Sequence, residues 1–245
     1  MAKERRAKTR TRRVKRSIKK VPAKAVAPEL TLDTSSKQAR GLAAVSHLMQ
    51  VDPRLAKIIK QVGTEYAIKI QSDPFRSLVE AIIYQQLAGR AADAIAARFL
   101  EIYGKTDFPV PAQILETEEA ILRQAGLSGR KIEYIRDLAG RVADGRLNLA
   151  DISAIAEDEK IIEQLTQVKG IGRWTAEMFL IFCLGRMDVL PVGDLGFRRA
   201  IQLNYGLEDL PSPETMHKIA KPWKPYSTVA TWYLWKSLEK FKGIG

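Results

Sequence analysis

The chain has 245 residues, 46% of them hydrophobic, and a formal net charge of +12. This length and composition fit one or two globular domains with a buried core, and no apolar run approaches the ~18 residues that a membrane-spanning helix needs. The single cysteine, Cys183, excludes an intramolecular disulfide and an iron–sulfur cluster held by four cysteines, and it indicates a reducing compartment. His47 and His217 do not have the spacing of metal ligands.

The positive charge is concentrated at the start of the chain. Residues 1–24 hold twelve of the 40 Lys and Arg residues but one of the 28 acidic residues, so the rest is nearly neutral. Because this stretch has no aromatic residue and little apolar surface to bury, we expect residues 1–40 to form a disordered basic arm and linker, followed by a folded core over 41–245. Such an arm can bind DNA phosphates, although nuclear-localisation tracts and organelle transit peptides have similar compositions.

Apolar residues recur at helical spacing along most of the remaining chain. The expected helices cover residues 42–49, 55–62, 74–83, 91–99, 114–122, 131–142 and 152–165, then a segment from about 173, and finally 195–201 and 227–240. Asp73 and Pro74 are typical of an N-cap and a first-turn proline. Strand-like alternation is nowhere sustained. The sequence therefore predicts an all-α protein.

Two glycines separate helical segments in the sequence Lys169-Gly170-Ile171-Gly172-Arg173. Glycine permits a tight turn with positive φ at no cost in Cβ contacts. The helix that begins near Arg173 has unpaired N–H groups in its first turn, which can bind a phosphate oxygen, and Lys169 and Arg173 add positive charge. Taken alone, the motif is equally compatible with a plain link between two packed helices.

Asp194 precedes a short helical segment, residues 195–201. An aspartate in this place is typical of a helix N-cap. A capping carboxylate is also held in a fixed orientation, so the cap is compatible with a chemical role for Asp194.

These motifs, in this order, resemble the helix-hairpin-helix-GPD family of DNA glycosylases. Val168 to Ala176 match the hairpin, and Pro191, Gly193 and Asp194 match the Gly/Pro-rich loop and its aspartate. Further segments resemble the AlkA-like 3-methyladenine glycosylase II branch: Asp73 to Phe75, Gln85 to Ala88, Gly126 to Ser128, and Lys131 with Tyr134 to Arg136. The resemblance implies a two-lobed helical core with a cleft, the hairpin at its mouth and Asp194 at its wall.

The resemblance also implies a reaction. A fixed carboxylate at Asp194 would stabilise the sugar cation formed when an N-glycosidic bond breaks, or orient water. Relatives that also cut the strand carry a lysine that forms a Schiff base, and Trp174 stands at its place here. We therefore expect a monofunctional hydrolase of base excision repair, which leaves an abasic site.

The expected base pocket consists of Trp174, Trp235, Met178 and Leu195. Alkylation at adenine N3 or guanine N7 makes the base positive, and tryptophan faces attract cations by about 0.5–2 kcal/mol. Trp232 and Tyr233 are alternatives to Trp235 as a wall. The sequence departs from the family at Met178 and Leu195, where some relatives have aromatic residues, and at Ser227, where an arginine is expected. The pocket can therefore differ in breadth or preference.

The target base must be flipped out of the duplex, and a side chain should fill the gap. The expected wedge is Gln86, with Leu87 second, at the end of a helix; surface glutamines at a helix C-terminus are the alternative. The expected partner is double-stranded DNA, and we expect the protein to bind it as a monomer and not to associate with a membrane. The expected location is the cytoplasm or nucleoid of a bacterium, or the nucleus of a eukaryote. No metal or cofactor is expected, except for a monovalent cation that the hairpin could hold against a phosphate.

Two other functions remain open from the sequence. The first is a non-catalytic helix-hairpin-helix module that binds DNA, against which Asp194 and Trp174 argue because a pure binder needs neither. The second is a glycosylase for mismatched, deaminated or oxidised bases.

Overall fold

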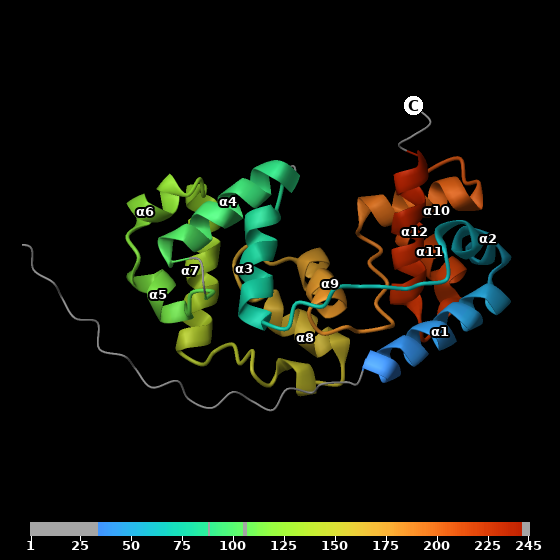
Figure 1. Cartoon of the computed structure of the whole chain (residues 1–245), viewed down its shortest axis with the longest axis horizontal. Coiled ribbons are helices and arrows are strands. Elements are labelled where there is room, and N and C mark those ends of the chain that lie inside the picture. The colour runs from blue at the N-terminus through green and yellow to red at the C-terminus, as the bar shows by residue number, and fades with distance from the viewer. Residues whose placement is uncertain (1–33, 88, 105–106, 242–245) are drawn as a thin grey trace, which may run out of the picture. The chain divides into compact units, whose positions relative to one another are not determined.

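The computed structural model describes residues 34–87, 89–104 and 107–241. Most of the predicted basic arm lies outside these ranges, and the first helix already begins at Thr34, upstream of the predicted boundary at residue 41. Every regular element in the described ranges is a helix, which confirms the all-α class (Figure 1). None of these helices combines the length and apolarity that a bilayer crossing requires.

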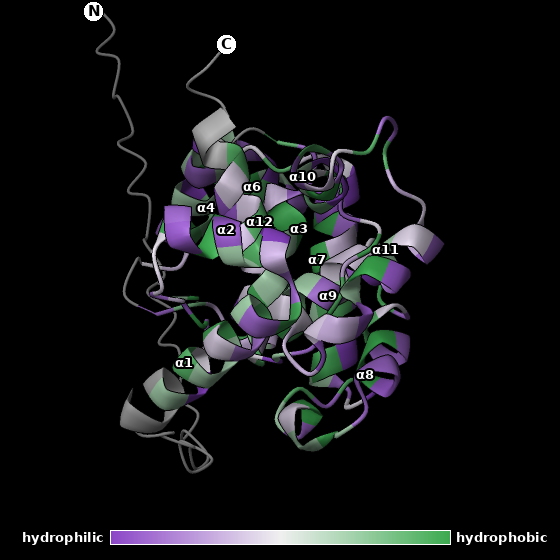
Figure 2. Ribbon diagram, turned by 90° about the vertical axis from the view of Figure 1, so that its right-hand side faces the viewer, coloured by the Kyte–Doolittle hydropathy of each residue, from purple (hydrophilic) through white to green (hydrophobic). Residues whose placement is uncertain are grey.

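The α-helices are α1 (Thr34–Val51), α2 (Pro53–Val62), α3 (Pro74–Tyr84), α4 (Gly89–Ile102), α5 (Pro111–Glu116), α6 (Glu119–Gln124), α7 (Gly129–Ala143), α8 (Asp158–Leu165), α9 (Arg173–Phe182), α10 (Leu195–Tyr205), α11 (Pro213–Ala220) and α12 (Ser227–Phe241). Two 3-10 turns, η1 (Ile152–Ala154) and η2 (Lys221–Trp223), complete the set. Many helices carry both apolar and polar faces, as Figure 2 shows, which is typical of helices that cover a core.

Two of the predicted helices are wrong in their extent. The segment 114–122 is divided into α5 and α6, because Thr117 leaves the helical conformation with φ −73 and ψ 129. Its hydroxyl donates to the Gln113 carbonyl at 2.7 Å, and Arg136 donates to the Thr117 carbonyl at 2.5 Å. The segment 152–165 is likewise divided into η1 and α8, with Ile155 extended between them. The prediction missed α11, although Ser212 caps it and Pro213 begins it.

The apolar side chains form two buried clusters. The first cluster comes from one continuous stretch, Phe75 to Val189, and includes α3 to α9. The second joins the two ends of the described chain, since α1 and α2 supply Ala44 to Ile59 and the C-terminal helices supply Phe197 to Leu234. Trp235 packs against both clusters. The chain passes from the first cluster back to the second between Val189 and Phe197, and this passage contains the loop with Asp194.

Asp52 joins the parts of the second cluster. It caps α2 through Oδ1, which accepts the backbone N–H groups of Arg54 at 2.9 Å and Leu55 at 3.1 Å. Its Oδ2 accepts the hydroxyl of Tyr205 at 2.6 Å and the indole N–H of Trp223 at 2.8 Å. Because Asp52 is buried, water could not accept these hydrogen bonds if the carboxylate were removed.

We expect Asp52→Ala to lower the free energy of unfolding by about 3 kcal/mol. Loss of the cap costs about 1 kcal/mol, and each buried donor left without an acceptor costs about 1–3 kcal/mol. Urea unfolding measures the difference. Tyr205→Phe is the control, because it removes one donor and leaves the carboxylate with its other partners; it should cost about 1 kcal/mol. Equal losses for the two variants would contradict the central role of Asp52.

Candidate active site

Asp194 caps α10, as its place in the sequence predicts. Its Oδ1 accepts the backbone N–H of Phe197 at 2.6 Å, and its carbonyl accepts the N–H of Arg198 at 2.9 Å. The backbone of Asp194 is extended, with φ −75 and ψ 119, which is the usual conformation of a cap. The side chain is only partly buried and therefore remains accessible from outside.

Two indoles from different helices also bind the Asp194 carboxylate. Trp174 of α9 donates its Nε1–H to Oδ2 at 2.9 Å, and Trp235 of α12 donates its Nε1–H to Oδ1 at 2.9 Å. The carboxylate thus accepts three N–H groups, from α9, α10 and α12, which fixes its orientation before any substrate arrives. Of the three aromatic candidates on α12, Trp235 is the one that reaches Asp194, since Tyr233 is fully buried and Trp232 packs on Tyr66 and Tyr233.

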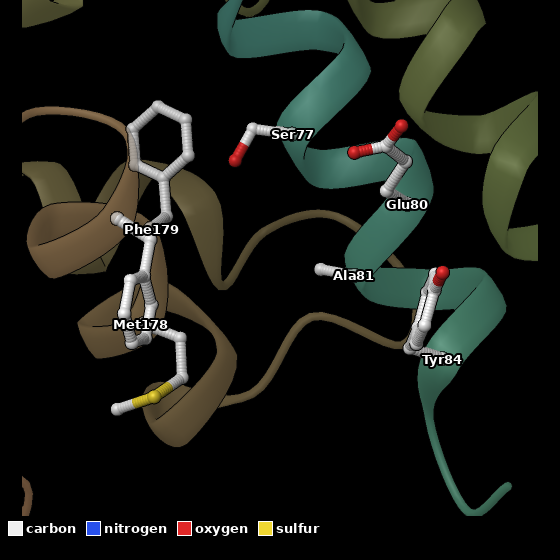
Figure 3. Close-up of a pocket in the computed structure, with 7 residues that line it drawn as sticks. Ser77, Glu80, Ala81, Tyr84, Met178 and Phe179 are labelled. Atoms are coloured by element: carbon white, nitrogen blue, oxygen red, sulfur yellow. The ribbon is translucent and has the colours of Figure 1, made fainter. Parts of the chain in front are cut away.

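A pocket of about 270 Å³ lies between α3 and α9 (Figure 3). It is lined by Ser77, Glu80, Ala81, Tyr84, Met178, Phe179 and Phe182. Two residues that line the pocket connect it to the indoles that bind Asp194. Phe182 stacks on Trp235, with ring centroids 6.0 Å apart and an interplanar angle of 17°, and Met178 lies one helical turn after Trp174.

The predicted pocket residues are therefore distributed over two neighbouring places. Met178 lines the pocket, whereas Trp174 and Trp235 hold Asp194. Leu195 follows Asp194 as the first residue of α10 and is 65% exposed. The α3 wall of the pocket was not predicted from the sequence. The sequence feature that could have indicated this wall is a set of residues at helical spacing beside the buried face of α3: Ser77, Glu80, Ala81 and Tyr84.

The hairpin between α8 and α9 turns at one glycine. Gly170 has φ +79, and a Cβ placed there would lie 2.0 Å from the Tyr134 ring. Gly172 has φ −93 and ψ 174 and is the extended N-cap of α9, so the positive φ that the sequence permits is used at Gly170 and not at Gly172. Ile171 between them is buried. The Gln85 side chain donates to the Gly170 carbonyl at 2.9 Å and so ties the end of α3 to the hairpin.

Both cations of the hairpin are paired with carboxylates. Lys169 Nζ lies 2.6 Å from Glu133 Oε1. Arg173 donates through both terminal nitrogens to Glu159, and its Nε lies 3.2 Å from Glu177 Oε1. The charge expected beside the hairpin is therefore largely offset within the protein. Because Glu177 is buried, desolvation raises the pKa of its carboxyl above the usual range.

The predicted wedge residues lie on the turn that follows α3. Gln86 has φ 57, a left-handed conformation that is uncommon outside glycine, and its side chain is exposed. Leu87 is also exposed. A second hollow, of about 650 Å³, separates this turn from the start of α7 and is lined by Gln85, Gln86, Ser128, Arg130, Lys131, Tyr134 and Gly170. The structure thus leaves Gln86 and Leu87 free to enter a duplex, and their role stays a prediction.

Three comparisons with known proteins agree with this geometry. The family model described as HhH-GPD superfamily base excision DNA repair protein matches residues 79–225. The DNA-3-methyladenine glycosylase 1 of Schizosaccharomyces pombe is 36% identical over 193 residues, which cover 78% of this chain and 85% of the relative.

Two solved structures are similar in fold. The S. pombe 3-methyladenine DNA glycosylase in complex with abasic DNA superposes with a TM-score of 0.73 at 35% identity, covering 80% of this chain and 97% of that one. A DNA-3-methyladenine glycosidase from Bacillus halodurans gives a TM-score of 0.73 at 41% identity, covering 82% and 91%. Together with the family match, these similarities confirm what the hairpin, the loop and Asp194 predict from the sequence: the chain belongs to the helix-hairpin-helix-GPD superfamily of base excision DNA repair proteins.

Proposed function

We propose that this protein is a monofunctional DNA glycosylase that removes N-alkylated bases of the 3-methyladenine and 7-methylguanine type from double-stranded DNA. It acts as a monomer and leaves an abasic site. The observation that carries the proposal is the Asp194 carboxylate held between the indoles of Trp174 and Trp235. The relatives named 3-methyladenine glycosylases support the same substrate class.

The fixed carboxylate explains how the bond would break. As the bond between base and sugar lengthens, positive charge develops on the sugar, and a preorganised anion beside it stabilises that charge without reorganisation. The three N–H donors hold Asp194 in one orientation. A non-catalytic DNA-binding module would not require an acidic group that is accessible and held by donors from three helices.

The first turn of α9 carries Trp174 rather than an amine. The indole N–H of Trp174 is donated to Asp194, and the nearby Lys169 belongs to the hairpin and is paired with Glu133. With no side-chain amine at this place, water is the nucleophile and the strand stays intact.

The substrate class follows from charge. An alkylated purine of this type is a cation, so its glycosidic bond is weak and the base needs little protonation to leave. Indole faces favour such a cation, and two indoles flank Asp194. Incubation with DNA methylated at adenine N3 and guanine N7, followed by chromatography of free bases, tests the proposal. Release of both methylated bases is the expected result; release of neither, with release of uracil or oxidised bases from duplexes that contain them, would contradict it.

We expect borohydride to trap no covalent complex between the protein and DNA during base release. Trapping requires an imine between an amine and the sugar, and the α9 position that could supply the amine carries Trp174. The measurement is denaturing electrophoresis of labelled DNA after reduction, with alkali treatment as the control that reveals abasic sites. A trapped adduct that disappears in the Lys169→Gln variant would show that the enzyme is bifunctional.

A further inference from the structure

The pocket between α3 and α9 has two unlike walls. The α9 wall, formed by Met178, Phe179 and Phe182, is apolar, with one thioether and two aromatic rings. The α3 wall carries a carboxylate, Glu80, and a phenol hydroxyl, Tyr84. In Figure 3, α3 with Ser77, Glu80, Ala81 and Tyr84 stands opposite α9 with Met178 and Phe179. The volume of about 270 Å³ is just below the roughly 300 Å³ at which pockets for drug-sized ligands begin, which suits a single base.

Glu80 has one oxygen available for a ligand. Its Oε1 accepts Nε–H of Arg76 at 2.7 Å, and no further hydrogen bond is formed by its Oε2 within the described ranges. The side chain is 29% exposed, so protein shields it from much of the solvent that would otherwise screen its charge. The ion pair with Arg76 holds the carboxylate in place, and it also offsets part of the charge.

Asp93 is a second carboxylate near this wall and adds to its negative charge. Tyr84 donates its hydroxyl to Asp93 Oδ1 at 2.5 Å. This hydrogen bond, together with burial and the charges of Asp93 and Glu80, raises the pKa of Tyr84 to about 12. The phenol therefore stays neutral at physiological pH, and because its hydrogen points to Asp93 its oxygen presents lone pairs to other neighbours.

We propose that Glu80 is a specificity-determining residue that makes this pocket select bases with a positive charge. A cationic base between the two walls has the rings and the thioether of α9 on one side and the carboxylate of Glu80 on the other. A neutral base of the same shape gains the apolar contacts but no charge interaction, while Glu80 still loses solvent. The inference rests on the proposed function and deepens it, because it names the residue that distinguishes a cationic base from a neutral one.

Two duplexes that differ in charge alone provide the test. Both carry a 2′-fluorinated sugar, which prevents excision; one holds 7-methylguanine, a cation in DNA, and the other 7-methyl-7-deazaguanine, which is neutral and has the same shape. Dissociation constants are measured by fluorescence anisotropy for each duplex. We expect the wild-type protein to prefer the cationic duplex by about fivefold, the size of a partly exposed charge pair. In Glu80→Gln the preference should fall toward the roughly twofold level that the aromatic faces alone provide, because the cationic duplex binds more weakly and the neutral duplex no longer desolvates a carboxylate.

In two further variants, the preference for the cationic duplex is expected to rise in one and to stay unchanged in the other. Arg76→Gln removes the counter-charge of Glu80 and should increase the preference for the cation. Glu119→Gln breaks a similar pair with Arg123 on α6, outside the pocket, and should leave the preference at the wild-type value. Equal binding of the two duplexes by the wild-type protein, or an unchanged preference in Glu80→Gln, would overturn the inference even if methylated bases are released. Failure to release any methylated base would instead overturn the proposed function.

Discussion

Replacing Asp194 by asparagine is expected to reduce base release by about a hundredfold to a thousandfold, the order found when a preorganised electrostatic group is removed. The asparagine Oδ1 can still accept Phe197 N–H and Trp235 Nε1–H, so the cap of α10 is retained. Its amide group carries no negative charge, and the sugar cation loses its partner. Single-turnover release from methylated DNA measures the effect, while binding to an abasic duplex should change little.

The asparagine has a second effect that needs its own control. Its Nδ2 group would face Nε1–H of Trp174, so two donors meet and that hydrogen bond is lost. Trp174→Phe also removes this hydrogen bond but keeps the carboxylate and an aromatic ring. If the charge of Asp194 is what matters, Trp174→Phe retains much more activity than Asp194→Asn. Equal loss in both variants would show that orientation of the side chain, and not its charge, limits the reaction.

Replacing Gly170 by alanine is expected to lower the free energy of unfolding by about 3 kcal/mol. A left-handed φ costs a residue with a Cβ about 1 kcal/mol, and the clash with the Tyr134 ring adds the cost of overpacking, about 1–3 kcal/mol. The Cβ would lie 2.0 Å from one ring carbon and 2.5 Å from Cγ, so the whole ring must move. Urea unfolding gives the stability, and affinity for an abasic duplex shows whether the hairpin keeps its shape.

Two matched variants separate the causes at Gly170. In a Tyr134→Ala background the same substitution should cost only about 1 kcal/mol, because the ring is absent and the strained φ remains. Gly172→Ala should cost less than about 1 kcal/mol, since a Cβ there meets nothing within 4 Å and φ is ordinary. A loss at Gly172 as large as that at Gly170 would show that the hairpin requires two glycines for a reason other than backbone geometry.

Local signals in the sequence predicted much of the fold and the centre of the site. The N-cap and first-turn proline of α3, the cap at Asp194 and the turn at Gly170 each depend on residues within about one helical turn of each other. The motif order predicted the superfamily, and the alignment singled out Trp174 and Trp235 as walls of the base pocket, although not as hydrogen-bond donors to Asp194. These features are local or have a fixed spacing, so one sequence is enough to recognise them.

Features that depend on tertiary contacts were missed. The break between α5 and α6 is supported by Arg136 of α7, which donates to the Thr117 carbonyl. The charge of Lys169 is offset by Glu133, on a different helix. Glu80 was not singled out from the sequence, because its place in a pocket depends on how α9 packs against α3. None of these partners is visible from hydrophobic periodicity.

The two buried clusters set an order in which the protein can become active during synthesis. The stretch from Phe75 to Val189 contains every buried residue of the first cluster, so a nascent chain can complete it while the C-terminal helices are still being translated. The second cluster requires α12 to meet α1 and α2 from the other end of the chain, and domains generally fold from the N-terminus during synthesis. Trp235 lies on α12 and donates to Asp194. The carboxylate is therefore fully held only after α12 has left the ribosome, and a chain that stops before α12 lacks one of the three donors that orient Asp194.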